Sequence, residues 1–286
     1  MNNFKYYARK VPFTGELRRW IRMATAKRYS EIELIETFPI YVPYSAGGEM
    51  DRAKLTIQTI NQIFPFLSSL AASAGARTVE VKDISTFPES KEDFEAVQSL
   101  KKYLDDYGSD KANHHHYHNL YGVILRNRSE VRGVLEIGMG TNNTDVVSNM
   151  GSAGKPGASL RAFRDFLGKA KIYGADIDQR ILFTEERIDT FFVDQVDPAS
   201  FVKLGKSIPS QLDLIIDDGL HSPDANVETL KFGLTKVKVG GWVVVEDIGM
   251  EALPVWEVVS ALLPSNYEPF IFSDEGSIVF AVKKSA

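Results

Sequence analysis

The chain has 286 residues, and its 33 basic and 38 acidic side chains give a formal net charge of −5. It contains no cysteine, which excludes disulfides, zinc–thiolate sites and a cysteine nucleophile. The negative charge gives no support for a general affinity for nucleic acid or membranes, and no segment approaches the length of a membrane span. The sequence therefore predicts a globular cytoplasmic protein with one large core, a smaller appended region and a small molecule as partner.

Residues 1–106 differ in pattern from the rest and predict an N-terminal α+β appendage. Residues between 32 and 42 include two extended-looking segments, whereas apolar residues recur at helical spacing over 53–64. A short strand is expected near residues 79–81, and residues 90–93 resemble a capping box. We expect this appendage to shape the substrate side of the site or to contact a second copy in a homo-oligomer.

Residues 107–286 are expected to form the main domain, because from Val131 onward apolar strands alternate with amphipathic helices. This alternation predicts a doubly wound α/β fold with a seven-stranded, mostly parallel sheet. The last two strands are separated by residues 273–276 (SDEG), so the final strand is expected to be antiparallel to its neighbours. The seven expected strands are Val131–Ile137, Lys171–Asp176, Thr190–Asp194, Leu212–Asp217, Trp242–Glu246, Glu268–Phe272 and Ser277–Val282.

Two of the expected helices have clear end signals. Ser159 is a candidate N-cap for a helix that stops at Gly168. Ser222, followed by Pro223, marks the start of a second helix. Because that helix begins directly after His221, the imidazole is expected at the rim, where strand gives way to helix.

A glycine turn follows the first strand of the main domain, in residues 134–143 (VLEIGMGTNN). Gly138 and Gly140 carry no side chain, so a ligand can approach the backbone there. Asn143 replaces the third glycine of the dinucleotide fingerprint. Glu136 would repel a pyrophosphate, but it could receive the ammonium group of an amino-acid cofactor.

Further polar residues end the next strands and complete an expected cofactor site. Asp176 is placed to take ribose hydroxyls. Asp194 and Gln195 end the third strand, where they could bind the adenine amino group or line its pocket. Any one acid could be a solvated strand end, but their recurrence at successive strand ends favours a binding site.

Two later strands stop on acids, in residues 215–221 (IIDDGLH) and 243–247 (VVVED). In a parallel sheet these acids lie at the carboxyl edge, where ligands bind. Carboxylate oxygens are hard ligands that suit Mg²⁺, and an imidazole beside them suits a general base. Three acids without a cation would repel one another, so a metal or an arginine is expected among them. The four residues of this expected reaction centre are Asp218, His221, Glu246 and Asp247.

From about Tyr107 to the C-terminus the chain resembles the S-adenosylmethionine-dependent O-methyltransferases of antibiotic sugars and related natural products, of the macrocin and mycinamicin type. A segment near residues 108–121, which contains Lys111, His115, Tyr117 and Tyr121, also resembles this family. The other motifs that carry the resemblance are residues 135–138 (LEIG), 158–161 (ASLR), 173–178 (YGADID), 216–221 (IDDGLH) and 245–247 (VED).

The resemblance implies a class I methyltransferase fold, S-adenosylmethionine as methyl donor and a sugar hydroxyl as acceptor. It further implies a Mg²⁺ ion held by Asp218, Glu246 and Asp247, with His221 as the base that deprotonates the acceptor. The chemistry agrees, because a divalent cation lowers the pKa of a coordinated hydroxyl and fixes its position.

Other residues are expected to support the cofactor. Ser159 and Arg161 belong to a family motif and are expected among the cofactor contacts. Asp217 is assigned to the cofactor side or to support of its loop. Residues 110–121 are interpreted as a lid or entry loop that leads into the helix before the first strand, in which Tyr117 packs on the cofactor and Lys111 anchors the loop.

Four of the five histidines form a run, His114, His115, His116 and His118. A zinc site there is disfavoured, because adjacent histidines diverge and no cysteine completes a tetrahedral set. Other functions remain open at this point. A vicinal aromatic diol could be the acceptor, a nicotinamide-dependent oxidoreductase could use a similar sheet, or the chain could bind a cofactor without catalysis.

Overall fold

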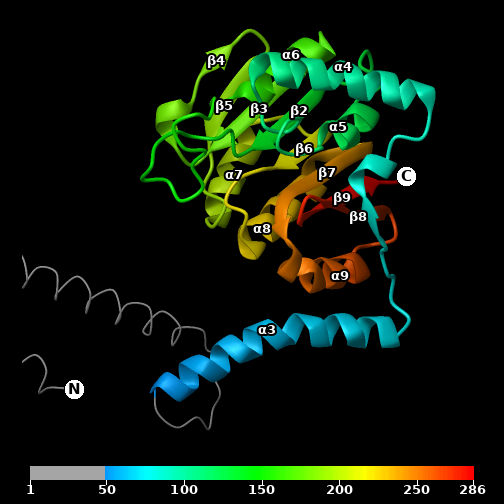
Figure 1. The fold of residues 1–286 in the computed structure, drawn as a ribbon. Coiled ribbons are helices and arrows are strands. Elements are labelled where there is room, and N and C mark those ends of the chain that lie inside the picture. Colours follow the sequence, from blue (N-terminus) through cyan, green and yellow to red (C-terminus); the bar gives the residue numbers. More distant parts are fainter. Residues whose placement is uncertain (1–48) are drawn as a thin grey trace, which may run out of the picture. The chain divides into compact units, whose positions relative to one another are not determined.

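The computed structural model describes residues 49–286, and the expected extended segments between 32 and 42 lie outside the described residues. The chain divides into two compact units, Met1–Leu67 and Ser68–Ala286. Of the first unit, the structure describes the initial part of the helix α3 (Glu49–Ser73), which confirms the helical spacing over 53–64. The second unit contains a sheet with helices on both of its faces (Figure 1).

One mixed sheet of nine strands runs through the second unit, in the order β1-β8-β9-β7-β6-β2-β3-β5-β4. Its centre is parallel, from β7 through β6, β2 and β3 to β5, whereas β9 runs antiparallel between β7 and β8. The predicted α/β fold and terminal hairpin are thus confirmed. The strands are β1 (Val81–Asp83), β2 (Gly133–Ile137), β3 (Lys171–Asp176), β4 (Thr184–Glu185), β5 (Ile188–Phe192), β6 (Leu212–Asp217), β7 (Val237–Gly249), β8 (Tyr267–Asp274) and β9 (Ser277–Lys284).

The two strands beyond the expected seven lie at the sheet edges. The strand β1 pairs in parallel with β8, and the two-residue β4 pairs with β5. The division of the chain also differs from the expected boundary at residue 106, because β1 joins the main sheet. The pairing of Val81 with Ile271 is long-range in sequence, so no local pattern could reveal it.

Helices cover both faces of the sheet (Figure 1). The helices α4, α5 and α6 lie on one face, and α7, α8 and α9 lie on the other. No helix among residues 49–286 is both long enough and apolar enough to cross a bilayer. These helices are α4 (Lys91–Tyr107), α5 (His118–Ile124), α6 (Ala158–Leu167), α7 (Pro198–Ser207), α8 (Pro223–Lys236) and α9 (Leu253–Leu262).

The helix ends test the cap predictions. The helix α8 begins after Ser222 with Pro223 at its first position, and α6 ends at Gly168, as expected. The prediction that Ser159 caps α6 is wrong. Gly157, in a left-handed conformation, is the N-cap, and the Ser159 hydroxyl instead donates to Glu136 at 2.6 Å. The Ser159 hydroxyl thus bonds to a buried carboxylate of β2 and not to the backbone at the start of the helix.

The predicted capping box at the start of α4 is confirmed. The Asp93 amide donates to the Ser90 hydroxyl at 3.1 Å, and the Ser90 amide donates to Asp93 at 3.0 Å. Arg126 also donates to Asp93 at 2.7 Å. Burial raises the pKa of Asp93, but the hydrogen bonds from Ser90 and Arg126 outweigh it and lower that pKa to about 2. The ionised carboxylate therefore stabilises the folded chain.

Replacing Asp93 with alanine is expected to lower the free energy of unfolding at pH 7 by about 1–2 kcal/mol, because the helix loses its cap. The folded pKa lies below the ordinary value, so this contribution is present above about pH 4 and is lost as the pH falls toward 2. Urea unfolding of both proteins at several pH values measures the difference. Glu92→Ala, in the same turn but exposed, is the control, and an Asp93→Ala effect independent of pH would contradict the assignment.

Candidate active site

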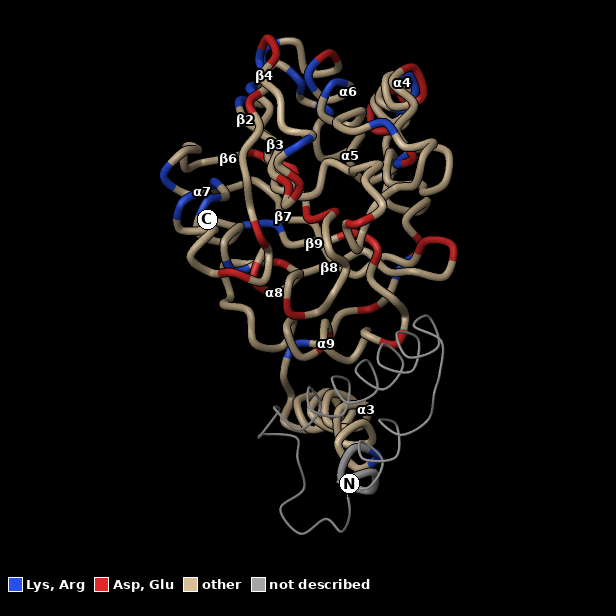
Figure 2. The backbone as a smooth tube through the Cα atoms, turned by 90° about the vertical axis from the view of Figure 1, so that its left-hand side faces the viewer, with Lys and Arg blue, Asp and Glu red and all other residues tan. Residues whose placement is uncertain are grey.

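The strand register brings the site residues to one edge of the sheet. Ala175, Ile137, Asp217 and Val245 lie side by side across β3, β2, β6 and β7. The residues that follow these four in sequence are, in the same order, Asp176, Gly138, Asp218 and Glu246. Parallel pairing thus turns four separate sequence positions into one row at the carboxyl edge. Figure 2 shows red, acidic segments around the labels β3, β7 and β9.

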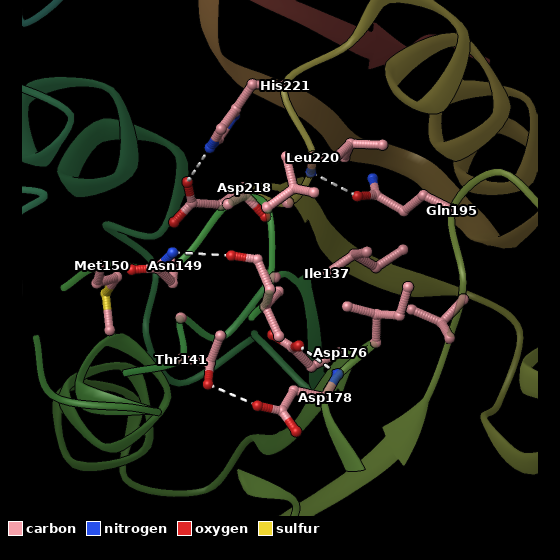
Figure 3. Close-up of a pocket in the computed structure, with 18 of the residues that line it drawn as sticks. Ile137, Thr141, Asn149, Met150, Asp176, Asp178, Gln195, Asp218, Leu220 and His221 are labelled. Atoms are coloured by element: carbon pink, nitrogen blue, oxygen red, sulfur yellow. Dashed lines mark hydrogen bonds and ion pairs between the residues drawn. The ribbon is translucent and has the colours of Figure 1, made fainter. Parts of the chain in front are cut away.

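A cavity of about 560 Å³ opens along this edge. Its size lies within the range usual for cofactor sites. His221 and Asp218 lie at one end, and Asp178 and Thr141 lie at the other (Figure 3). Among its lining side chains are one arginine, Arg180, and seven aspartates, so the cavity favours a cationic ligand. The seven are Asp110, Asp145, Asp176, Asp178, Asp194, Asp218 and Asp247.

The glycine turn allows the strand ends to approach closely. Gly138 has a φ of +86°, and a Cβ placed on it would lie 1.9 Å from the main-chain oxygen of Asp218. The Asp218 amide donates to the carbonyl of Ile137 at 2.7 Å. Only glycine therefore lets the loop after β6 lie against the loop after β2. Gly140 also has a positive φ, and both glycines line the cavity as predicted.

Asp176 lines the cavity at the end of β3, but it is also a structural residue. Its carboxylate accepts from the amides of Met139, at 2.8 Å, and Asp178, at 2.9 Å. Burial raises the pKa of Asp176 above its usual value. Each carboxylate oxygen has a second lone pair, so ribose hydroxyls can still be accepted.

Asp178 is a second acid at the same place that the sequence analysis did not single out. It accepts from Thr141 and Asn143, each at 2.7 Å, and from Arg180 at 2.6 Å. These hydrogen bonds, that of Arg180 foremost, hold the pKa of Asp178 well below its usual range. Arg180 also bonds to Asp145 at 3.0 Å, so it links the loop after β2 to the end of β3. The signal in the sequence was an acid two residues after Asp176.

Gln195 uses its amide within the protein. Its nitrogen donates to Asp217 at 2.7 Å and to Thr229 at 2.8 Å, and its oxygen accepts from the Leu220 amide at 2.8 Å. Gln195 and Asp194 both line the cavity. Asp217 is fully buried, and burial raises its pKa to about 6. The structure thus places Asp217 as a support of the loop, one of the two roles that the sequence left open.

A second cavity, of about 250 Å³, shares Gly140 and Asp218 with the first. Lys111 and Ser159 line it. Glu136 lies directly behind Ser159 and is fully buried, and burial raises its pKa to about 7. The two cavities are therefore adjacent at the glycine turn.

Lys111 is the cation among the acids. Its ammonium group lies 2.5 Å from Asp218 and 3.2 Å from Glu136, and it also donates to Glu246. Burial alone would lower the pKa of Lys111, but the three carboxylates, Asp218 first, raise it well above its ordinary value. The expected positive charge in the acidic cluster is therefore present, and it is a lysine instead of an arginine. Its position in sequence, 107 residues before Asp218, gave no sign of this contact.

Three side chains form the place where a cation could bind. Asp218, His221 and Asp247 each offer a ligand atom, and these atoms lie within 4.8 Å of one another. The Nε2 atom of His221 is 3.9 Å from a carboxylate oxygen of each aspartate. Glu246 is not in this group. It is fully buried, and it accepts from Lys111 and Tyr121.

His221 and Asp247 are also unusual in their backbone. Both are non-glycine residues with a positive φ, of 56° and 52°. Such a conformation is uncommon and costs energy, and it concentrates at functional sites. The Tyr117 hydroxyl donates to Asp247 at 2.5 Å, which fixes that side chain. The strained backbone supports a functional role for both residues.

Comparison with curated proteins finds relatives that share one activity. The 8-demethyl-8-alpha-L-rhamnosyl tetracenomycin-C 2'-O-methyltransferase of Streptomyces olivaceus is 28% identical over 239 residues, 77% of this chain and 60% of that protein. The demethylmacrocin O-methyltransferase of Streptomyces fradiae is 32% identical over 121 residues, 42% of this chain and 28% of that protein. The curated homologues of this chain are thus sugar O-methyltransferases. It spans less than two thirds of the length of either relative.

Solved structures agree on the fold. The MycE methyltransferase of the mycinamycin biosynthetic pathway, in complex with Mg and SAH, has a TM-score of 0.52 and 22% identity, covering 65% of this chain and 55% of that chain. Its complex with Mg, SAH and mycinamycin VI has a TM-score of 0.51. No family model matches the chain.

The structure gathers most of the expected site residues, though not all. Arg161 lines neither cavity, because its guanidinium bonds to Glu185 at 2.7 Å and lies over the ring of Phe183. Tyr117 is buried beneath Asp247 and lines neither cavity. The residues that line one cavity or both are Lys111, Gly138, Gly140, Ser159, Asp176, Asp194, Gln195, Asp218, His221 and Asp247.

The histidine run contributes a neighbour of the site. His115 stacks on Tyr117, with ring centroids 4.7 Å apart, and its Nδ1 atom is 3.6 Å from Asp247. His116 lies 2.7 Å from Asp274, in the hairpin of β8 and β9. Among residues 49–286, no candidate metal group includes a residue of the run.

Proposed function

We propose that this protein transfers a methyl group from S-adenosylmethionine to a hydroxyl of a sugar or glycosylated natural product, assisted by Mg²⁺. The observation that carries the proposal is the acidic cavity at the glycine turn, with Asp218, His221 and Asp247 at one end. The relatives act on a rhamnosyl tetracenomycin and on demethylmacrocin, according to their names, which supports a glycoside as acceptor.

The charge of the cavity distinguishes S-adenosylmethionine from a nicotinamide dinucleotide as the cofactor. S-adenosylmethionine carries a positive sulfonium, whereas a nicotinamide dinucleotide carries a negatively charged pyrophosphate. A lining with seven aspartates and one arginine favours the first and disfavours the second. Asp176 and Asp178 would take the ribose hydroxyls, and Glu136 with Ser159 would form the end of the site near the amino-acid portion.

The chain's own residues would bind and activate the acceptor. His221 is positioned to accept the proton of the acceptor hydroxyl, because it lines the cavity at the end where Asp218 lies. Asp218 and Asp247 flank the ring at 3.9 Å and would hold it in place. The sulfonium becomes a neutral thioether, so no acid is needed on that side. Positioning of the acceptor oxygen and loss of solvent would supply much of the rate.

The donor set fits a hard divalent cation. Asp218 and Asp247 supply half-buried carboxylate oxygens that line the cavity, and His221 lies beside them as the base and not as a ligand of the ion. Glu246 would complete the predicted three-acid set only after exchanging its hydrogen bond with Lys111. When bound, Mg²⁺ would lower the pKa of a sugar hydroxyl and orient it.

Radiolabelled S-adenosylmethionine tests the proposal directly. The protein is incubated with glycosides of tetracenomycin and macrolide type, with a catechol, and with Mg²⁺ or EDTA. We expect transfer to a glycoside, loss of transfer in EDTA and its recovery with added Mg²⁺. Undiminished transfer in metal-free buffer would reject the role of Mg²⁺. Methylation of the catechol alone would favour an aromatic diol as acceptor. Tight NAD binding without S-adenosylmethionine binding would reject S-adenosylmethionine as the cofactor.

Assembly and the N-terminal residues belong to the same proposal. We propose a homo-oligomer in which residues 1–106 shape the acceptor side of the site or contact a second copy. Sedimentation equilibrium of the full chain measures the assembly state, and a monomer at working concentration would reject the oligomer.

A further inference from the structure

Lys111 occupies the position that separates the cofactor side from the ion side of the site. Its side chain is 2% exposed, and its ammonium group lies between carboxylates from three places in the sheet. Glu136 comes from β2, Asp218 follows β6, and Glu246 belongs to β7. No other lysine among the described residues has ion pairs with three carboxylates.

The charge balance of this cluster depends on Lys111. Glu136 and Glu246 are fully buried, and burying an unpaired carboxylate is costly. Asp218 belongs both to the ion pairs of Lys111 and to the candidate metal group. One of its oxygens pairs with Lys111, and the other faces His221. A divalent cation that needs both Asp218 and Glu246 therefore meets an ammonium group already bound to them.

Glu136 offers the ammonium group a second position. One of its oxygens, Oε1, is fully buried and has no hydrogen-bond partner, although it lies 3.2 Å from the Lys111 nitrogen. A buried carboxylate oxygen that has an ion pair but no hydrogen bond is incompletely satisfied. A small shift of Lys111 away from Glu246 would satisfy this oxygen.

We propose that Lys111 is a built-in placeholder for the divalent cation, which the ion displaces toward Glu136 when it binds Asp218 and Glu246. The inference rests on the proposed metal-assisted function, and Lys111 is a positioning residue in it. The lysine keeps the acids ordered before the ion arrives, and it weakens ion binding because the ion must compete with it. The protein would thus be stable without metal, and metal binding would be readily reversible.

Lys111→Met tests the proposal, because methionine keeps the length of the side chain without its charge. Mn²⁺ binding is measured by electron paramagnetic resonance, and thermal unfolding is measured in EDTA and in Mn²⁺, without cofactor or acceptor. We expect the variant to bind Mn²⁺ about tenfold or more tightly than the unsubstituted protein. Its melting temperature should be lower in EDTA, and Mn²⁺ should raise it by about 5 °C or more. Equal affinity in the two proteins would overturn the proposal.

Two further variants complete the experiment. Lys101→Met removes a lysine that pairs with Asp105 at the surface, and it is expected to leave the Mn²⁺ affinity unchanged. If Lys111→Met is unfolded in EDTA, the double variant Lys111→Met/Glu246→Gln is decisive, because it removes one charge of each sign. The double variant should fold in EDTA, and one that stays unfolded would overturn the proposal. These experiments measure metal binding and stability, not methyl transfer. A negative result would therefore reject the role of Lys111 without rejecting the proposed methyltransferase function.

Discussion

Replacing His221 with asparagine is expected to lower the turnover number of methyl transfer by about two to four orders of magnitude, the usual effect of losing a general base. The cofactor dissociation constant should change little, because a base acts in the transition state. Asparagine adopts positive φ readily, so it keeps the backbone at φ 56° and removes only the imidazole. Steady-state kinetics and calorimetry with S-adenosylhomocysteine measure the two quantities.

A matched control exists at the other end of the strand β6. Gln211 also has a positive φ, of 70°, but it precedes β6, at the end of the strand opposite His221. Gln211→Asn therefore makes the same kind of backbone substitution away from the site, and it should leave turnover unchanged. A His221→Asn protein with full turnover would remove His221 from the mechanism.

Replacing Gly138 with alanine is expected to lower the free energy of unfolding by about 3 kcal/mol or more and to abolish cofactor binding. The new methyl group would meet main-chain atoms of Asp218 and Gly219 at 1.9–2.6 Å, and neither loop can yield by a side-chain rotation. The loop that carries Asp218 and His221 would have to move. Urea unfolding and calorimetry with S-adenosylhomocysteine measure both effects.

Gly240→Ala measures the cost of the left-handed backbone conformation alone, without a steric clash. Gly240 has a φ of +80°, close to that of Gly138, but no atom lies within 4 Å of a Cβ built on it. This variant should lose about 1–2 kcal/mol, the cost of a left-handed L-residue, and should bind cofactor normally. Equal effects at Gly138 and Gly240 would show that close approach of the two loops is unimportant.

Much of the fold could be predicted because its central strands have a strong local signal. The strands β2 and β6 are buried at every residue, and such strands appear in the sequence as mostly apolar runs. A short strand was predicted near the position of β1, but its pairing with β8 could not be, and β4 was not predicted at all. The edge strands β1 and β4 have three and two residues, and the partner of β1 is 190 positions away in sequence.

The site was predictable where its residues end strands, since register places the ends of parallel strands together. Asp176, Gly138 and Asp218 followed from this rule. The contacts of Lys111, Ser159 and Arg161 did not follow, because each side chain could reach more than one partner. In the structure Lys111 pairs with the acids, Ser159 bonds to Glu136 and does not cap its helix, and Arg161 pairs with Glu185. Competition among polar partners is settled by tertiary packing, which the local sequence does not encode.

We propose that a divalent ion binds beside the activated methyl donor at the carboxyl edge of the sheet. Crystals soaked with Mn²⁺ and S-adenosylhomocysteine test it most directly, because Mn²⁺ gives an anomalous signal. We predict one strong anomalous peak within ligand distance of Asp218 and Asp247, with the homocysteine sulfur directed toward it past Gly138. A peak elsewhere, or no peak when S-adenosylhomocysteine is bound, would contradict the claim.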